Sequence, residues 1–254
     1  MRKAFRWTYE RLAKGQSRRS ILRQCKPQKA LHRSVLEAFK KLDALTRFDR
    51  SAFADGTVLV GMDEVGRGPL AGPLIAACVH LPHSTSLLPY LRDSKKLKAT
   101  ERELLAVEIQ KTALATSYGV VEASEFGGEL NLHWLTFLAM QRALEALPID
   151  QTQSALLVDG KYSLPSWSGP QKAVIKGDDL SLSIAAASVL AKVKRDEIMT
   201  RLDQDFPVYG FASHVGYGTE KHRDALRKYG PCPHHRKNFL GRILNCETDT
   251  GSRD

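Results

Sequence analysis

One short segment constrains this chain more than any other: residues 63–73, which read Asp-Glu-Val-Gly-Arg-Gly-Pro-Leu-Ala-Gly-Pro. Two adjacent carboxylates, Asp63 and Glu64, end the apolar run of residues 58–62. Carboxylates at the end of a buried strand are costly to remove from water unless a cation or a metal pairs with them. The loop that follows has glycines on both sides of Arg67. Glycine lets the backbone approach a ligand closely, and arginine suits phosphate. The segment therefore predicts a metal site beside a phosphate-bearing substrate.

Acidic residues recur at the ends of predicted strands. The aspartates Asp63, Asp159 and Asp178 follow the apolar stretches 58–62, 155–158 and 172–177. One such acid is usually a turn former or a helix cap. Three of them, one doubled by Glu64, indicate a cluster of four carboxylates if the strand ends lie together. Hard oxygen ligands select Mg²⁺ or Mn²⁺ over zinc, and four carboxylates could hold two such ions, as suits in-line phosphodiester hydrolysis.

The hydrophobic pattern from residue 57 onward is that of an α/β domain. Two strands in hairpin order come first, and helices then alternate with strands, which predicts a mixed sheet with helices on its faces. Residues Thr100 and Glu103 form a capping-box pattern that predicts a helix start. The predicted strands are 58–63, 74–81, 116–121, 155–159 and 172–176, and the predicted helices are 100–112, 131–147 and 180–206.

The basic charge lies almost entirely in the first 50 residues. They hold 15 Lys and Arg against 4 Asp and Glu, a net charge of +11, whereas the rest of the chain has a net charge of −1. A basic arm beside a near-neutral body suggests a polyanion partner, although a solvated charged segment is an equally good interpretation. Ser34 and Glu37 resemble a capping box that opens a helix over 34–46. Its apolar stripe could instead dock the extension on the body.

Composition excludes several protein classes. The sequence has no run of about 18 apolar residues that would span a membrane and no apolar core of a secretory signal. Its 4 cysteines are widely spaced and form no C-x-x-C pair, which indicates a reducing compartment and argues against a disulfide framework or a thiolate zinc site.

Residues 63–73 closely resemble the signature of the type 2 ribonucleases H, specifically ribonuclease HII. The resemblance covers roughly residues 57–242, and the motifs together, in this order, are very specific. They lie at residues 93–97, 158–160, 176–178, 183–188, 191–193, 209–211, 216–218 and 234–236. The resemblance implies a ribonuclease H-like fold, with a five-stranded mixed sheet flanked by helices and a C-terminal helical cap. We expect a basic, helical N-terminal extension (1–55), a catalytic domain (56–206), a C-terminal substrate-contacting segment of the same domain (207–246) and a polar tail (247–254).

The resemblance also implies roles for individual residues. The family's four metal-binding catalytic carboxylates match Asp63, Glu64, Asp159 and Asp178. The loop whose backbone reads the ribose 2′-hydroxyl at an RNA–DNA junction matches Gly66, Arg67 and Gly68, and the tyrosine that stacks on the neighbouring deoxyribose matches Tyr217. A segment expected near the substrate backbone contains Lys95 and Lys96, which could equally be solvated surface lysines.

Four positions depart from the family pattern or compete with it. Lys161 follows Val-Asp-Gly where Asn is common, and Asp179 doubles the last aspartate. Val215 stands where Lys is usual, which would weaken one phosphate contact. Asp196 is a further acid, which we interpret as a helix-surface residue.

The resemblance implies an endoribonuclease that cleaves the RNA strand of RNA–DNA hybrids and nicks duplex DNA on the 5′ side of an embedded ribonucleotide. A two-metal mechanism with Mg²⁺ or Mn²⁺ would leave 3′-hydroxyl and 5′-phosphate ends. The duplex would be recognised by its shape, phosphates and 2′-hydroxyl. Roles in ribonucleotide excision repair and RNA primer removal are implied, and we expect a cytoplasmic monomer without membrane attachment.

Two alternatives remain open at this stage. A type HIII ribonuclease H would lack the junction preference, but that family has Gly-Lys-Gly at the position of residues 66–68. It also has an N-terminal substrate-binding domain of sheet type, for which residues 1–50 look too short and too helical. A non-catalytic hybrid-binding protein is the second alternative, and the presence of all four carboxylates gives it no support.

Overall fold

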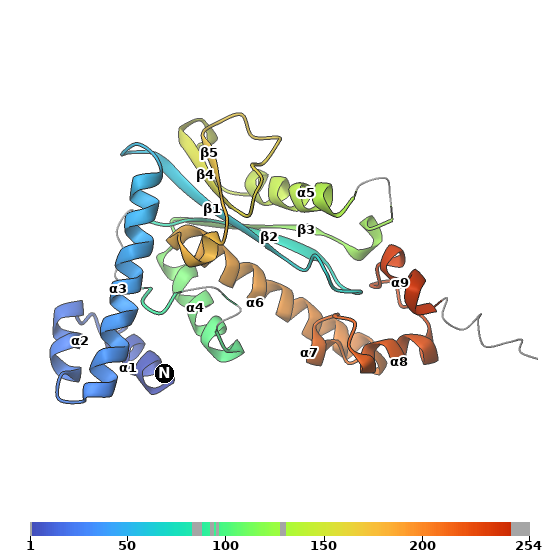
Figure 1. Cartoon of the computed structure of the whole chain (residues 1–254), viewed down its shortest axis with the longest axis horizontal. Helices are drawn as coiled ribbons and strands as arrows, with labels where there is room; N and C mark the ends of the chain where they lie inside the picture. The colour runs from blue at the N-terminus through green and yellow to red at the C-terminus, as the bar shows by residue number, and fades with distance from the viewer. Residues whose placement is uncertain (1, 83–87, 92–93, 95–96, 128–130, 245–254) are drawn as a thin grey trace, which may run out of the picture.

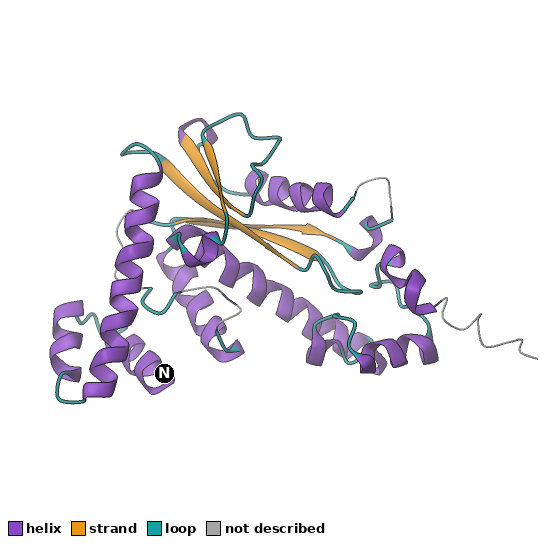
Figure 2. Ribbon diagram, in the orientation of Figure 1, coloured by secondary structure: helices purple, strands orange, loops and turns teal. Residues whose placement is uncertain are grey.

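The computed structural model describes residues 2–82, 88–91, 94, 97–127 and 131–244. Its sheet has the strand order β3-β2-β1-β4-β5, with β1 at the centre. β1 pairs antiparallel with β2 and parallel with β4, while β3 is antiparallel to β2 and β5 is parallel to β4. The predicted five-stranded mixed sheet is therefore confirmed (Figure 2). The strands are β1 (Val58–Val65), β2 (Leu74–His80), β3 (Ala115–Val121), β4 (Ser154–Asp159) and β5 (Gln171–Val174).

Helices cover both faces of the sheet (Figure 1). On one face lies the long helix α6 (Leu182–Asp205), with α4 (Ala99–Thr112) packed beside it, and on the other lies α5 (Leu132–Glu145). Successive side chains of a strand point to opposite faces. Accordingly, Ala77 and Val79 of β2 pack in the core on the α6 side, and Ala76 and Cys78 pack in the core under α5.

The C-terminal segment forms a separate helical cap. Its helices are α7 (Phe211–His214), α8 (Glu220–Tyr229) and α9 (Lys237–Leu244). Phe211, Leu226 and Leu240 pack with Met199 and Leu202 from the last turns of α6. The cap is thus built on the end of the helix that runs beneath the sheet, as the family resemblance predicted.

The N-terminal extension folds into three helices, α1 (Arg2–Leu12), α2 (Arg18–Cys25) and α3 (Lys29–Ala52). Phe39, Leu42 and Leu45 of α3 are buried in the same apolar cluster as residues of α4 and α6. The capping box predicted at Ser34 is wrong, because α3 begins at Lys29 and Ser34 lies inside it. The apolar stripe of α3 docks on the body, and this packing extends the helix beyond the local signal.

Two other local predictions need correction. The capping box predicted at Thr100 is displaced, since α4 begins at Ala99 and the Glu101 carboxylate accepts a hydrogen bond from the Lys98 N–H at 3.1 Å. The last strand ends at Val174, two residues early. Lys176, with φ of +56°, then turns the chain into a short 3₁₀ turn, η4 (Gly177–Asp179). In the part of the chain described above, no helix is long and apolar enough to cross a membrane.

Candidate active site

Parallel pairing of β1 with β4 brings two of the predicted acids to one edge of the sheet. Met62 pairs with Val158 in this register, so Asp63 and Asp159 are the next residues along the two neighbouring strands. Asp63 is only 7% exposed, and its Oδ1 accepts a hydrogen bond from the Glu64 N–H at 2.7 Å. The carboxylates of β1 and β4 therefore meet where the sequence predicted a cluster.

Asp178 reaches this edge through the 3₁₀ turn η4 and not through a strand. The N–H of Gly177 donates to the Asp159 Oδ1 at 2.7 Å, so Asp178 directly follows a residue that contacts Asp159. A side chain at Gly177 would clash, because an added Cβ would lie 2.5 Å from the Ile184 Cδ1 and 3.1 Å from the Asp159 Oδ1. The neighbouring Asp179 has its carbonyl bonded to a residue of α3, Lys41, at 2.7 Å.

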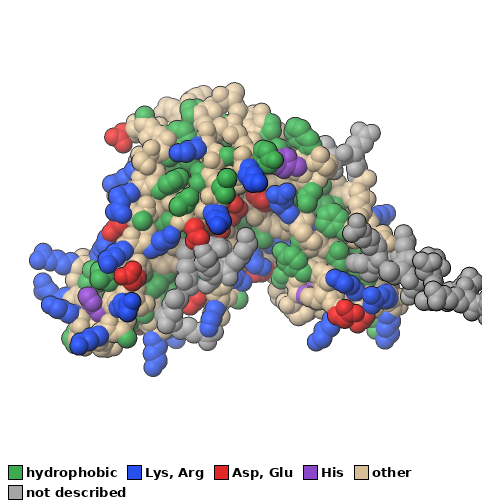
Figure 3. Space-filling model, in the orientation of Figure 1, with side chains coloured by type: hydrophobic (Ala, Val, Ile, Leu, Met, Phe, Trp, Pro, Cys, Tyr) green, Lys and Arg blue, Asp and Glu red, His purple; other side chains and the backbone are tan. Residues whose placement is uncertain are grey.

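The electrostatics of the edge are those of crowded negative charge. Burial raises the pKa of Asp63 well above its usual range, and the carboxylates of Glu64 and Asp159 raise it further. Burial also raises the pKa of Glu64; Arg67, 3.4 Å away, lowers it, and Asp159 raises it again. Figure 3 shows acidic side chains gathered near the middle of one face of the molecule, with Lys and Arg side chains around them.

The residues at this edge fit a hard divalent cation. Their donors are carboxylate oxygens, and a bound cation would relieve the repulsion that raises the pKa of Asp63. Among the residues that the structure describes, no three Asp, Glu, His or Cys side chains already stand in a coordination shell. The fit therefore rests on the donor chemistry and on the excess of negative charge.

A buried arginine that the sequence reasoning missed holds the loop beside these acids. Arg236 has no exposed surface and stacks on the Phe126 ring, 3.9 Å from its centroid. Burial, and then the charge of Arg195, lowers its pKa to about 9, which leaves it charged at neutral pH. Its guanidinium donates hydrogen bonds to the carbonyls of Gly66 (2.6 Å), Gly72 (2.9 Å), Pro69 (3.0 Å) and Arg67 (3.1 Å).

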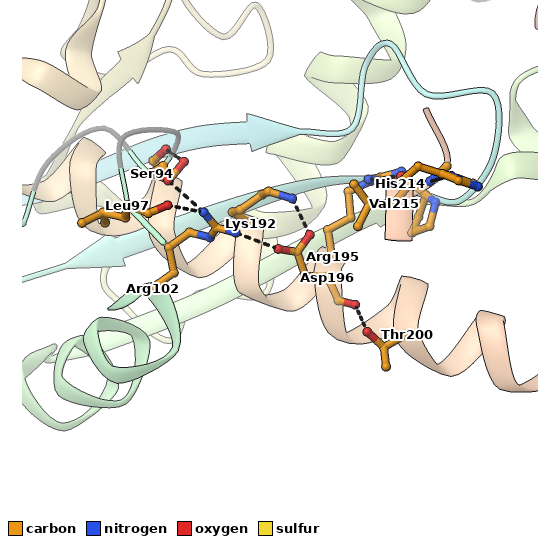
Figure 4. A network of polar contacts seen from close by, with 12 residues as sticks. Ser94, Leu97, Arg102, Lys192, Arg195, Asp196, Thr200, His214 and Val215 are labelled. Atoms are coloured by element: carbon orange, nitrogen blue, oxygen red, sulfur yellow. Dashed lines mark hydrogen bonds and ion pairs between the residues drawn. The ribbon is translucent and has the colours of Figure 1, made fainter. Parts of the chain in front are cut away.

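Arg195 of α6 supports the same loop from below (Figure 4). It is fully buried, and burial lowers its pKa to about 10. It donates to the carbonyls of Val215 (2.8 Å), Pro73 (2.9 Å) and Ala71 (3.0 Å). Gly66 fits against it in a conformation with φ of +94°, and an added Cβ would lie 2.5 Å from the Arg195 Nε. Only glycine suits this position, for both reasons.

The two arginines set which way the loop's peptide groups face. In a trans peptide the C=O and the following N–H point in opposite directions. Because Arg236 holds the carbonyls of Gly66 and Arg67, the N–H groups of Arg67 and Gly68 point away from it. Both residues are exposed, and neither N–H donates to another backbone group in the described ranges. The Tyr217 ring lies alongside, since an added Cβ at Gly68 would be 3.9 Å from its Cε1.

Comparison with known proteins identifies the protein family. A sequence model described as Ribonuclease HII matches residues 60–245. The chain belongs to the ribonuclease HII family. A ribonuclease HII of Syntrophotalea carbinolica is 52% identical over 183 residues, which are 72% of this chain and 85% of the relative. That of Geobacillus kaustophilus is 43% identical over 235 residues, or 92% of this chain and 87% of the relative, a match long enough to include part of the N-terminal extension.

Solved structures agree on the fold. The ribonuclease H2 of Pyrococcus horikoshii has a TM-score of 0.63 at 23% identity and covers 73% of this chain and 96% of its own. The ribonuclease HII of Archaeoglobus fulgidus, solved in complex with PCNA, has a TM-score of 0.60 at 25% identity and covers 70% and 93%. Members of this family are metal-dependent endoribonucleases of the ribonuclease H class, and this chain is accordingly a phosphodiester hydrolase that acts on RNA–DNA hybrids.

The structure also places other residues singled out in the sequence, apart from two lysines beyond the described ranges. Asp196 pairs with Lys192 of α6 and with Arg102 of α4 (Figure 4), so it lies where α6 faces α4 and is partly buried, not on an open helix surface as we interpreted it. Val215 adopts φ of +44°, an unusual conformation for a β-branched residue. Its carbonyl is bonded to Arg195. Lys95 and Lys96 lie outside the described residues.

A network of buried histidines holds the backbone of Tyr217. The Cys232 N–H donates to the Nδ1 of His235, so a neutral His235 carries its proton on Nε2 and donates to the Nε2 of His222 at 3.0 Å. His222 then donates from Nδ1 to the Tyr217 carbonyl at 2.9 Å. The ring of His214 stacks on that of His222, with centroids 4.4 Å apart. A second proton on either His222 or His235 would break one of these hydrogen bonds.

This network predicts acid sensitivity of the cap. Burial lowers the pKa of His222, and burial together with the neighbouring His222 lowers the pKa of His235 from 6.5 to about 4. Below about pH 6.5 the unfolded chain therefore binds protons that the folded chain does not, so stability falls as the pH decreases toward 4. At pH 5 His235 makes the free energy of unfolding change by about 1.2 kcal/mol per pH unit. The free energy of unfolding, measured by denaturant titration at several pH values between 5 and 7.5, should depend less on pH for His235→Asn than for wild type. An equal pH dependence in the two proteins would contradict the network.

Proposed function

We propose that Asp63, Glu64, Asp159 and Asp178 hold the Mg²⁺ or Mn²⁺ ions of this ribonuclease HII and form its catalytic centre. The observation that carries the proposal is the meeting of Asp63 and Asp159 on neighbouring parallel strands, where burial and then the nearby Glu64 carboxylate raise the pKa of Asp63. Asp178 joins them through Gly177, whose N–H is bonded to Asp159. Two bound ions would activate a water and stabilise the leaving 3′-oxygen, which gives 3′-hydroxyl and 5′-phosphate ends.

The substrate proposed for this centre is an RNA–DNA hybrid, or duplex DNA with an embedded ribonucleotide that is nicked on its 5′ side. The outward N–H groups of Arg67 and Gly68 would donate to the ribose 2′-oxygen, which is absent from DNA. The half-exposed Tyr217 ring, beside Gly68, would stack on the next deoxyribose. Nicking at such sites suits ribonucleotide excision repair and the removal of RNA primers.

The type HIII alternative is less well supported. Bst-RNase HIII, solved with Mn²⁺, shares the fold at a TM-score of 0.54, but it is 20% identical to this chain, whereas the ribonuclease HII sequence model matches residues 60–245. The residue between Gly66 and Gly68 is arginine, as in ribonuclease HII. A non-catalytic hybrid-binding protein is tested by incubating a labelled hybrid with the protein, with and without Mg²⁺. Binding without Mg²⁺-dependent cleavage would favour that alternative.

The proposed junction reading predicts a selective loss of activity. Arg67→Ala and Tyr217→Ala should each lower kcat/KM on a duplex with a single ribonucleotide by roughly 10- to 100-fold, and on a long hybrid by less. A long hybrid offers many registers, so a weakened junction contact matters less there. Parallel kinetics on the two substrates measure this selectivity. Equal losses on both would indicate general substrate positioning instead of junction reading, and Tyr229→Ala, which removes an exposed tyrosine of α8, is the matched control.

A further inference from the structure

The first turn of α6 is capped by a residue from the N-terminal extension. A helix leaves its first N–H groups without partners inside the helix. In α6 these are the N–H groups of Leu182 and Ser183, which donate to the Asp49 carboxylate at 3.2 and 2.8 Å, and that of Ile184, which donates to the Ser181 hydroxyl at 3.2 Å. Asp49 lies near the end of α3, so a charge that is more than 130 residues away in sequence completes this helix terminus.

A second contact from the same helix reaches the turn that carries Asp178. The Lys41 ammonium donates to the Asp179 carbonyl at 2.7 Å. Lys41 and Asp49 are eight residues apart, which is about 12 Å along a helix. Lys41 contacts the chain just before Leu180 and Ser181, and Asp49 contacts it just after them. The two residues thus hold both ends of the short link between the turn η4 and α6. Figure 1 shows α3 crossing one end of the sheet beside the start of α6.

Apolar packing also holds this end of α3 against the sheet. Phe48, Ala52 and Phe53 pack against Leu157 and Val174, whose strands lead to the catalytic edge. Three hydrogen bonds hold the turn η4. The Asp159 carboxylate accepts from the Gly177 N–H, and Lys41 donates to the Asp179 carbonyl. The Ser181 N–H donates to the Gly177 carbonyl at 2.8 Å. Asp178 lies between these contacts.

We propose that Lys41 and Asp49 are positioning residues that fix the turn carrying Asp178, so that the basic extension supports divalent-metal binding at the catalytic centre. This inference rests on the proposed role of Asp178 as a metal ligand. Groups that orient a metal ligand without touching the metal commonly change metal affinity by 10- to 100-fold when they are removed. Lys41 and Asp49 act through backbone groups, so we expect a smaller effect, roughly 5- to 10-fold for each.

The sign of the two effects separates positioning from simple electrostatics. If only charge mattered, loss of the Lys41 cation would strengthen binding of a divalent ion, and loss of the Asp49 anion would weaken it. Positioning predicts that both Lys41→Met and Asp49→Ala weaken it. Lys41→Arg keeps a cationic donor and should restore most of the affinity. Asp43→Asn is the matched control, because the carboxylate of Asp43 pairs only within the extension in the contacts described, with Arg18 at 2.7 and 2.8 Å.

The experiment is a calorimetric titration of Mn²⁺ into each full-length variant without nucleic acid, with hybrid affinity measured separately in EDTA. We expect weaker Mn²⁺ binding for Lys41→Met and Asp49→Ala, hybrid affinity within about twofold of wild type, and no change in either for Asp43→Asn. Unchanged Mn²⁺ affinity in both variants, with a lower melting temperature or weaker hybrid binding, would overturn the inference. Asp178→Asn is the reference, since wild-type Mn²⁺ affinity in that variant would overturn the proposed metal site itself.

Discussion

Replacing Asp63 with Asn is expected to abolish cleavage while leaving the protein folded and able to bind a hybrid. Asp63 is the most buried of the four acids and lies beside Asp159 on the parallel strand pair, where the proposed metal ions would be held. Loss of its charge should remove several kcal/mol of transition-state stabilisation, which is a loss of roughly 10³-fold or more in kcat. Single-turnover cleavage of a labelled hybrid at saturating Mg²⁺ measures the effect.

The stability of this variant gives an independent check. The pKa of Asp63 is raised by burial and by its acidic neighbours, so the charged form is disfavoured in the metal-free chain. Asn, which is neutral and of similar size, should therefore leave the melting temperature unchanged or higher. Asp196→Asn is the matched control, because Asp196 is an aspartate of α6 in ion pairs with Arg102 and Lys192. Activity of Asp63→Asn within tenfold of wild type would contradict the assignment of the catalytic centre.

Substitution of Arg236 is expected to change the conformation of the loop of residues 66–73 more than any other single substitution proposed above. Arg236→Met would leave four carbonyls without their donor, at a cost of about 1–3 kcal/mol for each that stays both buried and unpaired. Arg236→Lys keeps the charge, but its single ammonium cannot span the four carbonyls that the planar guanidinium reaches. We expect a lower melting temperature for both variants and a loss of about 100-fold in kcat/KM on the single-ribonucleotide duplex for Arg236→Lys.

The conservative variant separates the loop's orientation from global stability. Arg236→Lys should be assayed well below its melting temperature, with Arg227→Lys, an exposed arginine of α8 in ion pairs with Asp224 and Glu220, as the control. If the N–H groups of Arg67 and Gly68 are misdirected, the loss on the single-ribonucleotide duplex should exceed that on a long hybrid. Wild-type junction cleavage by Arg236→Lys would show that the guanidinium does not orient the loop.

Much of the fold was predictable because its strands are short apolar stretches that end in an acid or a turn. The apolar stretches before Asp63 and Asp159 are β1 and β4, and the small residues of the predicted 180–206 helix correspond to α6 packed against the central strand. Gly61 of β1 shows how close this packing is, since an added Cβ would lie 2.5 Å from the Ile184 backbone nitrogen. The meeting of Asp63 and Asp159 follows from the parallel register, which a single sequence suggests but does not fix.

What the sequence did not reveal are hydrogen bonds between segments that are far apart in the chain. Arg236 belongs to the family motif at 234–236 and Arg195 lies in a predicted helix, and neither motif nor helix indicates that both are buried and bonded to carbonyls of residues 66–73 and 215. Buried arginines have no periodic signature, because their partners are backbone carbonyls of any residue type. The docking of α3 was likewise left open, since its charge and its apolar stripe gave opposite indications and only tertiary packing decides between them.

The most direct test is to map the cut in a DNA duplex that contains one ribonucleotide, with and without Mg²⁺. The proposed centre and the outward N–H groups of Arg67 and Gly68 predict a single Mg²⁺-dependent nick on the 5′ side of the ribonucleotide, with 3′-hydroxyl and 5′-phosphate ends. Asp63→Asn should give no product under the same conditions. A duplex left intact while a long hybrid is cleaved would contradict recognition of the RNA–DNA junction. A nick that forms without a divalent ion would contradict metal-dependent hydrolysis.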